Sequence, residues 1–215
     1  MIYLNLPVWY RFTKADLKRW AADKSGRGRN PLPGTENTPP EHRYSAGYEH
    51  VHSEYLVKPQ YLNPITEQYQ RQLAKALSNY GQKDWETVSV RDFCRGELTK
   101  CNLLALVGPK LFELAPDFLD NLWEFDDHIM SLALGFPKWI YPAPYHAQQR
   151  YLDAIQRYLD AAWAGFDWNN DSSVEEPWEE HFGARVSREV VKWFREKKFE
   201  GRQVEAGAIG ILAWA

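Results

Sequence analysis

The final stretch of the chain, AGAIGILAWA at 206–215, is an apolar run that any fold of this sequence must cover. Burying Ile209, Leu212 and Trp214 stabilises a fold by about 1.5–3 kcal/mol for each side chain, so a folded protein is not expected to leave them in water. No cap, glycine stop or polar tail follows Trp214, although helices usually close with such signals. We therefore expect an unfinished apolar edge that requires a partner surface, and we interpret the chain as half of something larger.

Upstream of this run, apolar residues recur mainly at helical spacing. The glycine- and proline-rich stretch SGRGRNPLPGTENTPPEHR at 25–43 predicts a long loop, and 85–90 predicts a short extended link. There is no internal repeat and almost no strand pattern, so the expected fold class is all-α, with 1–215 as one partial domain. The predicted helices span 13–23, 44–57, 64–79, 90–107, 116–134, 145–166 and 178–199.

The composition excludes some classes of partner. The net charge is -3, and basic residues are scattered among acids, so we expect no nucleic-acid partner. Ten Trp, twelve Tyr and ten Phe favour dense helix packing or a large apolar ligand over disorder. Trp123, Trp139 and Trp163 could face a ligand or the core, and packing is the simpler interpretation.

The two cysteines and the first residues predict a compartment. Cys94 and Cys101 on one helix would lie about 10.5 Å apart along its axis, beyond the roughly 7 Å limit for a disulfide. Two unpaired thiols are typical of a reducing compartment. The N-terminus, MIYLNLPVWYRF, has no basic region and contains Pro7, so it predicts neither a signal peptide nor a membrane span. We expect a soluble, intracellular chain, or one attached peripherally to a membrane.

The clusters of ionisable residues are interpreted as structural rather than as metal-binding or catalytic. His50 and Glu54 could converge on one helix face as metal ligands, but we predict no metal site. Glu124 and His128 are spaced as a surface pair rather than as a catalytic acid and base. The acidic run EEPWEEH at 175–181 is predicted to begin a helix, where acids complement the helix dipole.

Other catalytic signatures are missing from the sequence. GRGRN lacks the preceding strand and the lysine of a phosphate loop, and no serine stands in a G-x-S-x-G turn. We therefore predict no catalytic residue in this chain.

Three segments in order carry a family resemblance. They are SGRGRNPLPG followed by a helix and YLNPITEQYQRQLAKAL, then LWEFDDHIMSLALGFPKWIYPAPYHAQQRYLDAIQRYL, and finally EAGAIGILAWA. Together they resemble cytochrome P-450 heme-thiolate monooxygenases, in the branch that contains sterol 7-alpha-hydroxylases, prostacyclin synthase and many fungal enzymes. The resemblance runs from about Trp20 onward.

The resemblance implies a role for each part of the chain. The helix at 44–57 would pass beside the heme propionates, and the terminal segment would begin the long helix over the distal face of the heme. The family's cysteine loop and its Glu-x-x-Arg pair have no counterpart in this sequence. Relatives often place Trp and Arg four residues apart on the propionate-side helix, whereas this chain offers Tyr48 and His52, so His52 and Arg43 are the candidate propionate contacts.

The implied parent activity is insertion of one oxygen atom from O₂ into a lipophilic sterol, lipid or secondary metabolite. A flavin reductase would deliver electrons from NADPH, and the family resides at the endoplasmic reticulum membrane through an anchor that would precede Met1. Without a proximal thiolate, we expect this chain to hold heme unproductively and to be inactive on its own.

Two alternatives stay open at this point. One is a non-enzymatic helical module that binds a lipid or a partner through the apolar edge at 206–215 and the aromatic helices. The other is a misdrawn gene whose true product continues beyond Ala215.

Overall fold

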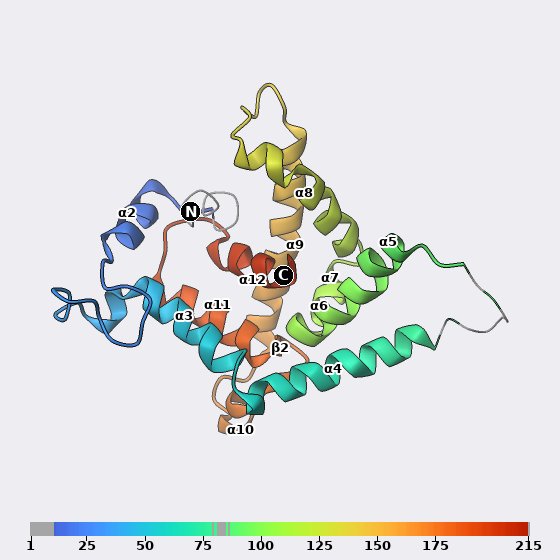
Figure 1. The fold of residues 1–215 in the computed structure, drawn as a ribbon, viewed down its shortest axis with the longest axis horizontal. Helices are drawn as coiled ribbons and strands as arrows, with labels where there is room; N and C mark the ends of the chain where they lie inside the picture. Colours follow the sequence, from blue (N-terminus) through green and yellow to red (C-terminus); the bar gives the residue numbers. More distant parts are fainter. Residues whose placement is uncertain (1–10, 79, 81–84, 86, 215) are drawn as a thin grey trace.

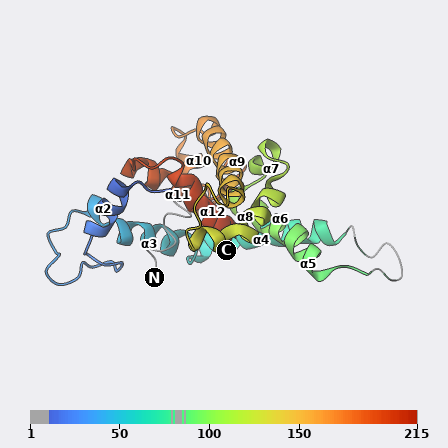
Figure 2. The same cartoon turned by 90° about the horizontal axis from the view of Figure 1, so that it is seen from above.

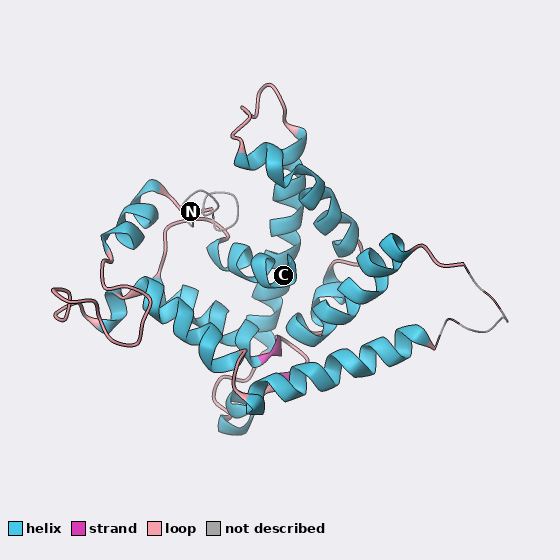
Figure 3. Cartoon of the chain, viewed as in Figure 1, coloured by secondary structure: helices cyan, strands magenta, loops and turns pink. Residues whose placement is uncertain are grey.

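The computed structural model describes residues 11–78, 80, 85 and 87–214, and it describes residue 214 without its side chain. Helices make up 68% of the chain, and the described residues form one sheet of two short strands, which confirms the expected all-α class (Figure 3). The prediction that the N-terminus, MIYLNLPVWYRF, is neither a signal peptide nor a membrane span concerns residues that lie largely outside the described part of the chain. The helices and strands are α2 (Lys14–Ala22), η2 (Pro40–His42), α3 (Tyr44–Tyr55), α4 (Pro59–Leu77), α5 (Val90–Phe93), η3 (Cys94–Leu98), α6 (Thr99–Val107), α7 (Lys110–Leu114), α8 (Phe118–Ala133), α9 (Ala143–Gly165), α10 (Asp171–Glu175), β1 (Trp178–Glu179), β2 (Gly183–Ala184), α11 (Arg185–Lys197) and α12 (Val204–Trp214).

The long helix α9 is the centre of the architecture (Figure 1). Helices α8 and α12 both pack against it, and α11 joins α12 to α3. Helix α4 packs against α6 on the other side of the molecule. Turned by 90°, the helices form a broad, shallow body with α2 and α5 toward opposite ends (Figure 2).

Aromatic rings of α8 and α9 form the middle of the core. Tyr151 is fully buried and stacks with Phe118 and Phe125 at centroid distances of 5.4 and 4.9 Å. Its hydroxyl donates a hydrogen bond of 2.9 Å to the carbonyl oxygen of Gly210, which joins α9 to α12. A Cβ at Gly210 would lie 3.0 Å from the Tyr151 ring, so the small residue allows this close approach.

A contact between two glycines fixes the small sheet against α6. Gly108 and Gly183 both have positive φ, at 76° and 71°, a region that other residues rarely adopt. A Cβ on Gly183 would collide with the backbone nitrogen of Gly108, so the two chain segments meet only because neither carries a side chain. Tyr158 donates nearby to the carbonyl oxygen of Val107 over 2.8 Å.

Asp16 ties the first described helix to the segment before α12. This fully buried carboxylate accepts hydrogen bonds from the backbone nitrogens of Glu200 and Gly201, at 2.8 and 2.7 Å, as well as from Thr13. Burial alone raises the pKa of Asp16, but these hydrogen bonds outweigh it and lower the pKa below its ordinary value.

Several predicted boundaries are wrong for identifiable reasons. The gap left between the predicted helices 44–57 and 64–79 is largely helical, because α4 begins at Pro59, a residue that suits the first turn of a helix. The predicted helix 90–107 is interrupted by the π-helical segment η3. The predicted helix 178–199 begins only at Arg185, since the residues before it form the hairpin of β1 and β2.

The apolar end of the chain is covered, contrary to the expected exposed edge. Within α12, every residue from Ala206 to Gly210 is buried, as are Leu212 and Ala213. The partner surface is supplied by α9, α11 and α6 of the same chain. Elsewhere, none of the helices in the described part is both long and apolar enough to cross a membrane.

Candidate functional site

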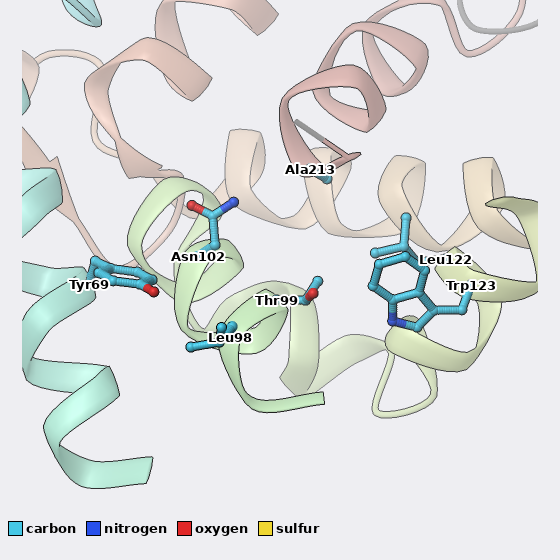
Figure 4. A pocket seen from close by; sticks show the side chains of 7 residues that line it. All are labelled: Tyr69, Leu98, Thr99, Asn102, Leu122, Trp123 and Ala213. Atoms are coloured by element: carbon cyan, nitrogen blue, oxygen red, sulfur yellow. The ribbon is translucent and has the colours of Figure 1, made fainter. Parts of the chain in front are cut away.

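A pocket of about 350 Å³ lies where α4, α6, α8 and α12 meet. Figure 4 shows Tyr69 at one side and Leu122 with Trp123 at the other, while Ala213 of α12 lies opposite Thr99 and Asn102. The side chains that line the pocket are Tyr69, Leu98, Thr99, Asn102, Leu122, Trp123 and Ala213. Its position beside α12 makes it the candidate site of this chain.

Side-chain contacts between η3 and α8 hold the wall of the pocket that η3 and Trp123 form. A π-helical segment departs from the regular i to i−4 ladder, so its carbonyl groups can need other partners. The indole nitrogen of Trp123 donates to the carbonyl oxygen of Arg95 over 2.8 Å, and the Arg95 guanidinium lies 4.6 Å from the Trp123 ring centroid. Arg95 also pairs with Asp127 at 3.2 Å. These contacts lock the Trp123 ring as a wall of the pocket.

The pocket combines apolar walls with the uncharged polar groups of Tyr69, Thr99 and Asn102. The Thr99 hydroxyl donates to the carbonyl oxygen of Cys94 over 2.9 Å, which leaves its oxygen able to accept. The Asn102 amide makes no hydrogen bond to the part of the chain that the structure describes, and it can both donate and accept. No carboxylate, imidazole or amine is among the described lining residues, which combine apolar side chains with neutral hydrogen-bonding groups.

Arg43 lies at the end of the long loop and the start of α3. Its guanidinium donates to the carbonyl oxygens of Arg29 and Gly28, at 2.9 and 2.7 Å, and to the Ser25 hydroxyl at 3.1 Å. These bonds give Arg43 a role in holding the loop. It also lines a separate surface pocket of about 610 Å³, together with Arg27, Arg29, His50 and others.

His52 lies one turn beyond Tyr48 on α3, as the sequence spacing requires. Its ring contacts the Tyr48 ring at a centroid distance of 4.4 Å, and its Nδ1 lies 2.9 Å from the Tyr48 carbonyl oxygen. The ring is half-buried and is not among the described lining residues of the pocket that Arg43 shares with His50. The structure therefore does not bring His52 and Arg43 together into one described pocket.

Neither cysteine fits an axial heme ligand. Cys94 is exposed in η3, whereas Cys101 is 3% exposed inside α6. Burial, assisted by the nearby Glu97, raises the pKa of the Cys101 thiol and so disfavours the thiolate that would bind iron. The described residues also contain no group of three or more His, Cys, Asp or Glu side chains able to hold a metal ion.

The expected pair between Glu124 and His128 does not form. Glu124 pairs with Arg150 of α9, with an N–O distance of 2.5 Å. The His128 ring instead contacts Tyr141, at a centroid distance of 5.7 Å. The i to i+4 spacing was compatible with a pair, but side chains of neighbouring segments offered each residue another partner.

The acidic run at 175–181 does not begin a helix, which corrects the capping interpretation. Glu179 accepts hydrogen bonds from the backbone nitrogens of His181 and Phe182, at 2.7 and 2.6 Å, and so closes the hairpin turn. Glu175 pairs with Arg185 at 2.8 Å, and the hydrogen bond from that guanidinium, together with its charge, lowers the pKa of Glu175.

The three singled-out tryptophans have different environments. Trp123 lines the pocket, and Trp163 is half-buried beneath the guanidinium of Arg195, 4.4 Å from its ring centroid. Trp139 is 84% exposed, so packing in the core is the wrong interpretation for this residue.

Sequence reasoning missed Tyr69, Thr99 and Asn102 as lining residues. A usable signal existed for two of them, because Thr99 and Asn102 stand three residues apart in the otherwise apolar stretch before Val107. Nothing in the sequence singled out Tyr69, since its place at the pocket depends on how α4 packs against α6.

Comparison with known proteins identifies the family. No family model matches the chain, and no solved structure matches it significantly. The cytochrome P-450 monooxygenase calL of Penicillium decumbens is 33% identical over 181 residues, which are 84% of this chain and 34% of the relative. The cytochrome P-450 monooxygenases fsoE of Humicola fuscoatra and efuG of Hormonema carpetanum are 24% and 23% identical over 72% of the chain, and these matches cover 27% and 28% of the relatives.

The chain thus spans about a third of the length of the curated relatives it matches, or somewhat less. All three relatives are fungal monooxygenases of one family, and the mainly helical architecture agrees with the resemblance of the three ordered segments. The chain belongs to the cytochrome P-450 monooxygenase family.

Proposed function

We propose that this chain forms the substrate-access part of a heme-dependent monooxygenase that hydroxylates a lipophilic sterol, lipid or secondary metabolite with O₂. The observation that carries this proposal is the 33% identity to a fungal cytochrome P-450 over 84% of the chain. We further propose that residues 1–215 are one part of a single P-450 domain and that the chain alone is inactive.

Heme is the cofactor of this family, and the residues of this chain do not supply its axial ligand. Thiolate-bound heme activates O₂ by favouring cleavage of the O–O bond. Cys94 is exposed on η3, and burial raises the pKa of the Cys101 thiol, which disfavours a thiolate there. This disagreement supports the proposal that the chain has no monooxygenase activity by itself.

Arg43 and His52 are proposed as residues on the propionate side of the heme. Support for Arg43 comes from its position at the start of α3, where its guanidinium borders a surface pocket with Arg27 and Arg29. Guanidinium groups are good carboxylate partners because they can donate two parallel hydrogen bonds. His52 could offer a further donor from the same helix.

The pocket beside α12 is proposed to hold an apolar part of the substrate. Leu98, Leu122 and Trp123 provide apolar contacts, while Asn102 offers a hydrogen bond to a carbonyl or hydroxyl group. These residues would bind and orient the substrate and take no part in proton transfer. The electron donor is proposed to be an NADPH-dependent flavin reductase, and the site of action the endoplasmic reticulum membrane.

A heme titration tests the proposed inactivity. Hemin is added to the purified chain, reduced and exposed to CO, and the absorbance spectrum is recorded. We expect no Soret band of the thiolate type, because neither cysteine fits the axial position. Such a band with substrate turnover would contradict the proposal, and the variants Cys94→Ser and Cys101→Ser would then identify the ligand.

Hemin affinity tests the propionate residues. Quenching of tryptophan fluorescence by hemin is compared for the wild type, His52→Gln, Arg43→Gln and the control Arg71→Gln, whose side chain is exposed on α4. A selective loss of affinity in the first two variants supports the proposed contacts. Equal affinity in all four proteins would refute them. His52→Gln is the cleaner variant, since Arg43 also holds the loop.

A further inference from the structure

The π-helical segment η3 changes the backbone hydrogen bonds within the helical stretch 90–107. In a regular α-helix, the nitrogen of Thr99 would donate to the carbonyl oxygen of Arg95, four residues earlier. In the structure, this nitrogen donates instead to the carbonyl oxygens of Cys94 and Gly96. The Arg95 carbonyl therefore lacks the partner that an α-helix would give it, and buried or half-buried carbonyl groups need another.

Trp123 of α8 takes the place of that backbone partner. Its indole nitrogen donates to the Arg95 carbonyl oxygen over 2.8 Å, and an indole N–H can only donate. The Arg95 guanidinium lies 4.6 Å from the Trp123 ring centroid, so the same residue contacts the ring twice. The Thr99 hydroxyl adds a bond of 2.9 Å to the Cys94 carbonyl oxygen, which also favours the π-helical arrangement.

The two sides of η3 are packed to different degrees. Helix α6, which follows η3, contains the buried residues Cys101, Leu103, Ala105 and Val107. Helix α5, which precedes it, contains no buried residue, and Val90 is 76% exposed. The Phe93 ring contacts Tyr80 at a centroid distance of 5.6 Å. Packing thus fixes the helix after η3 firmly and the helix before it only weakly.

This asymmetry allows the helix a second register. Changing the π turn into an α turn requires α5 to rotate by about 100° and to move about 1.5 Å along the axis. Because α5 buries little, its packing opposes such a movement weakly. The contacts of η3 itself, above all the bond from Trp123 to the Arg95 carbonyl, therefore decide the register.

The register also shapes the pocket beside α12. Leu98 ends η3 and Thr99 follows it, and both line the pocket with Trp123 (Figure 4). A change of register alters the backbone that carries these two side chains. Single π turns within α-helices are found frequently at functional sites, where they place side chains that a regular helix would place elsewhere.

We propose that the helical stretch 90–107 has two registers, π and α, and that Trp123 is the positioning residue that selects the π register. In the α register, the Thr99 nitrogen bonds to the Arg95 carbonyl oxygen, which Trp123 occupies in the π register. One ordinary hydrogen bond changes such an equilibrium about fivefold. The inference concerns the conformation of this chain and does not depend on the proposed monooxygenase activity.

NMR couplings across hydrogen bonds identify the register directly. The deuterated chain is labelled with ¹⁵N in threonine and with ¹³C at the carbonyl group of either cysteine or arginine. A coupling from the Thr99 nitrogen to the Cys94 carbonyl carbon reports the π register, and a coupling to Arg95 reports the α register. Cys94 and Cys101 are the only cysteines in the sequence, so the signal is readily assigned. The wild type is expected to show the Cys94 coupling.

A second labelling scheme tests the role of Trp123 without any substitution. With ¹⁵N in tryptophan and ¹³C at the arginine carbonyl groups, the wild type is expected to show a coupling from the Trp123 indole nitrogen to the Arg95 carbonyl carbon. This measurement keeps the proposal testable if substitutions at Trp123 prevent folding.

Trp123→Phe is the decisive variant, because it removes the indole N–H and keeps an aromatic ring. The coupling of Thr99 to Cys94 is expected to weaken and the coupling to Arg95 to appear, with a shift of the register equilibrium by about fivefold. Trp163→Phe is the matched control, since Trp163 of α9 also lies against a guanidinium, 4.4 Å from that of Arg195. It is expected to keep the wild-type couplings. Thermal melting checks that each variant folds.

Four results would overturn the inference. The first is a wild type whose Thr99 nitrogen couples to Arg95 and not to Cys94. The second is the absence of a coupling between Trp123 and Arg95 in the wild type. The third is a folded Trp123→Phe variant that keeps the Cys94 coupling in full. The fourth is an equal change of register in Trp163→Phe, which would show that Trp123 has no specific role.

Discussion

The two most apolar segments of the chain have opposite environments. In α12, which packs against α9, α11 and α6, Ile209 is 1% exposed, whereas Ile140 in the connection between α8 and α9 is 58% exposed. The sequence predicted that the terminal run needs an external partner, and it placed GFPKWIYPAPY between the predicted helices 116–134 and 145–166. The comparison teaches that apolar composition predicts the need for a partner surface, but not whether the same chain supplies it.

The difference follows from geometry rather than from hydrophobicity. Helix α12 presents small residues, including Gly210, that allow α9 to approach closely, and Tyr151 bonds to its backbone. The connection between α8 and α9 contains prolines that end regular structure, and it projects at the far end of these two helices (Figure 1). Burial of one segment and exposure of the other are thus properties of the packing.

The largest predicted effect comes from the same substitution in both segments. Ile209→Ala is expected to lower the free energy of unfolding by about 2–5 kcal/mol, because it leaves a cavity against α9. Ile140→Ala is expected to change it by less than about 0.5 kcal/mol, because its side chain is already in water. Urea unfolding followed by circular dichroism measures both. Similar losses in the two variants would break the contrast between the segments.

Asp16 anchors the segment that leads into α12, so its loss is expected to rank next. Asp16→Asn should cost about 1–3 kcal/mol near neutral pH, since the carboxylate accepts hydrogen bonds from Glu200 and Gly201. The native pKa of Asp16 is lowered, so its stabilising contribution is present above the unfolded pKa of about 4 and disappears as the pH falls through the native pKa.

The pH dependence of unfolding checks this assignment. Denaturant unfolding of the wild type and of Asp16→Asn at a series of pH values should show two curves that converge toward acid. Glu67→Gln, on the exposed side of α4, is the control and should leave the pH dependence unaltered. A constant difference between wild type and Asp16→Asn at every pH would show that the ionised carboxylate is not the stabilising form.

A smaller effect is predicted for the hydroxyl that joins α9 to α12. Tyr151→Phe should cost about 1–2 kcal/mol, because the buried carbonyl of Gly210 loses its hydrogen bond from the Tyr151 hydroxyl. Tyr141→Phe, in the exposed connection between α8 and α9, makes the same change and should be close to neutral. Thermal unfolding monitored by calorimetry compares the two, and an equal shift would argue against a specific role for the buried hydroxyl.

The smallest predicted change in stability belongs to Trp139→Ser. Removing this 84% exposed ring should alter the free energy of unfolding by less than about 0.5 kcal/mol, because the ring already lies in water. Unfolding in urea gives the comparison. A loss of more than about 2 kcal/mol would mean that the ring packs against the protein in solution, contrary to the structure.

Much of the helical layout could be predicted from the sequence. The helix expected at 145–166 is observed as α9, because its apolar residues recur every three or four positions and pack on one side. The hairpin before α11 escaped prediction, since its Gly183 has a positive φ and meets the backbone of Gly108, a residue far away in the sequence. At the pocket, Thr99 and Asn102 were missed although they are polar residues in an apolar stretch, and the contribution of Tyr69 depended on helix packing.

The sequence alone determined the all-α class and the cytochrome P-450 resemblance, because helical periodicity and ordered motifs are local features of the chain. Tertiary structure decided which apolar segment is covered, which residues line the pocket and where the ionisable side chains find partners. Those outcomes depend on contacts between residues far apart in the chain, such as Tyr151 with Gly210 and Asp16 with Glu200. Local patterns contain no information about such distances, so only the packed helices could settle them.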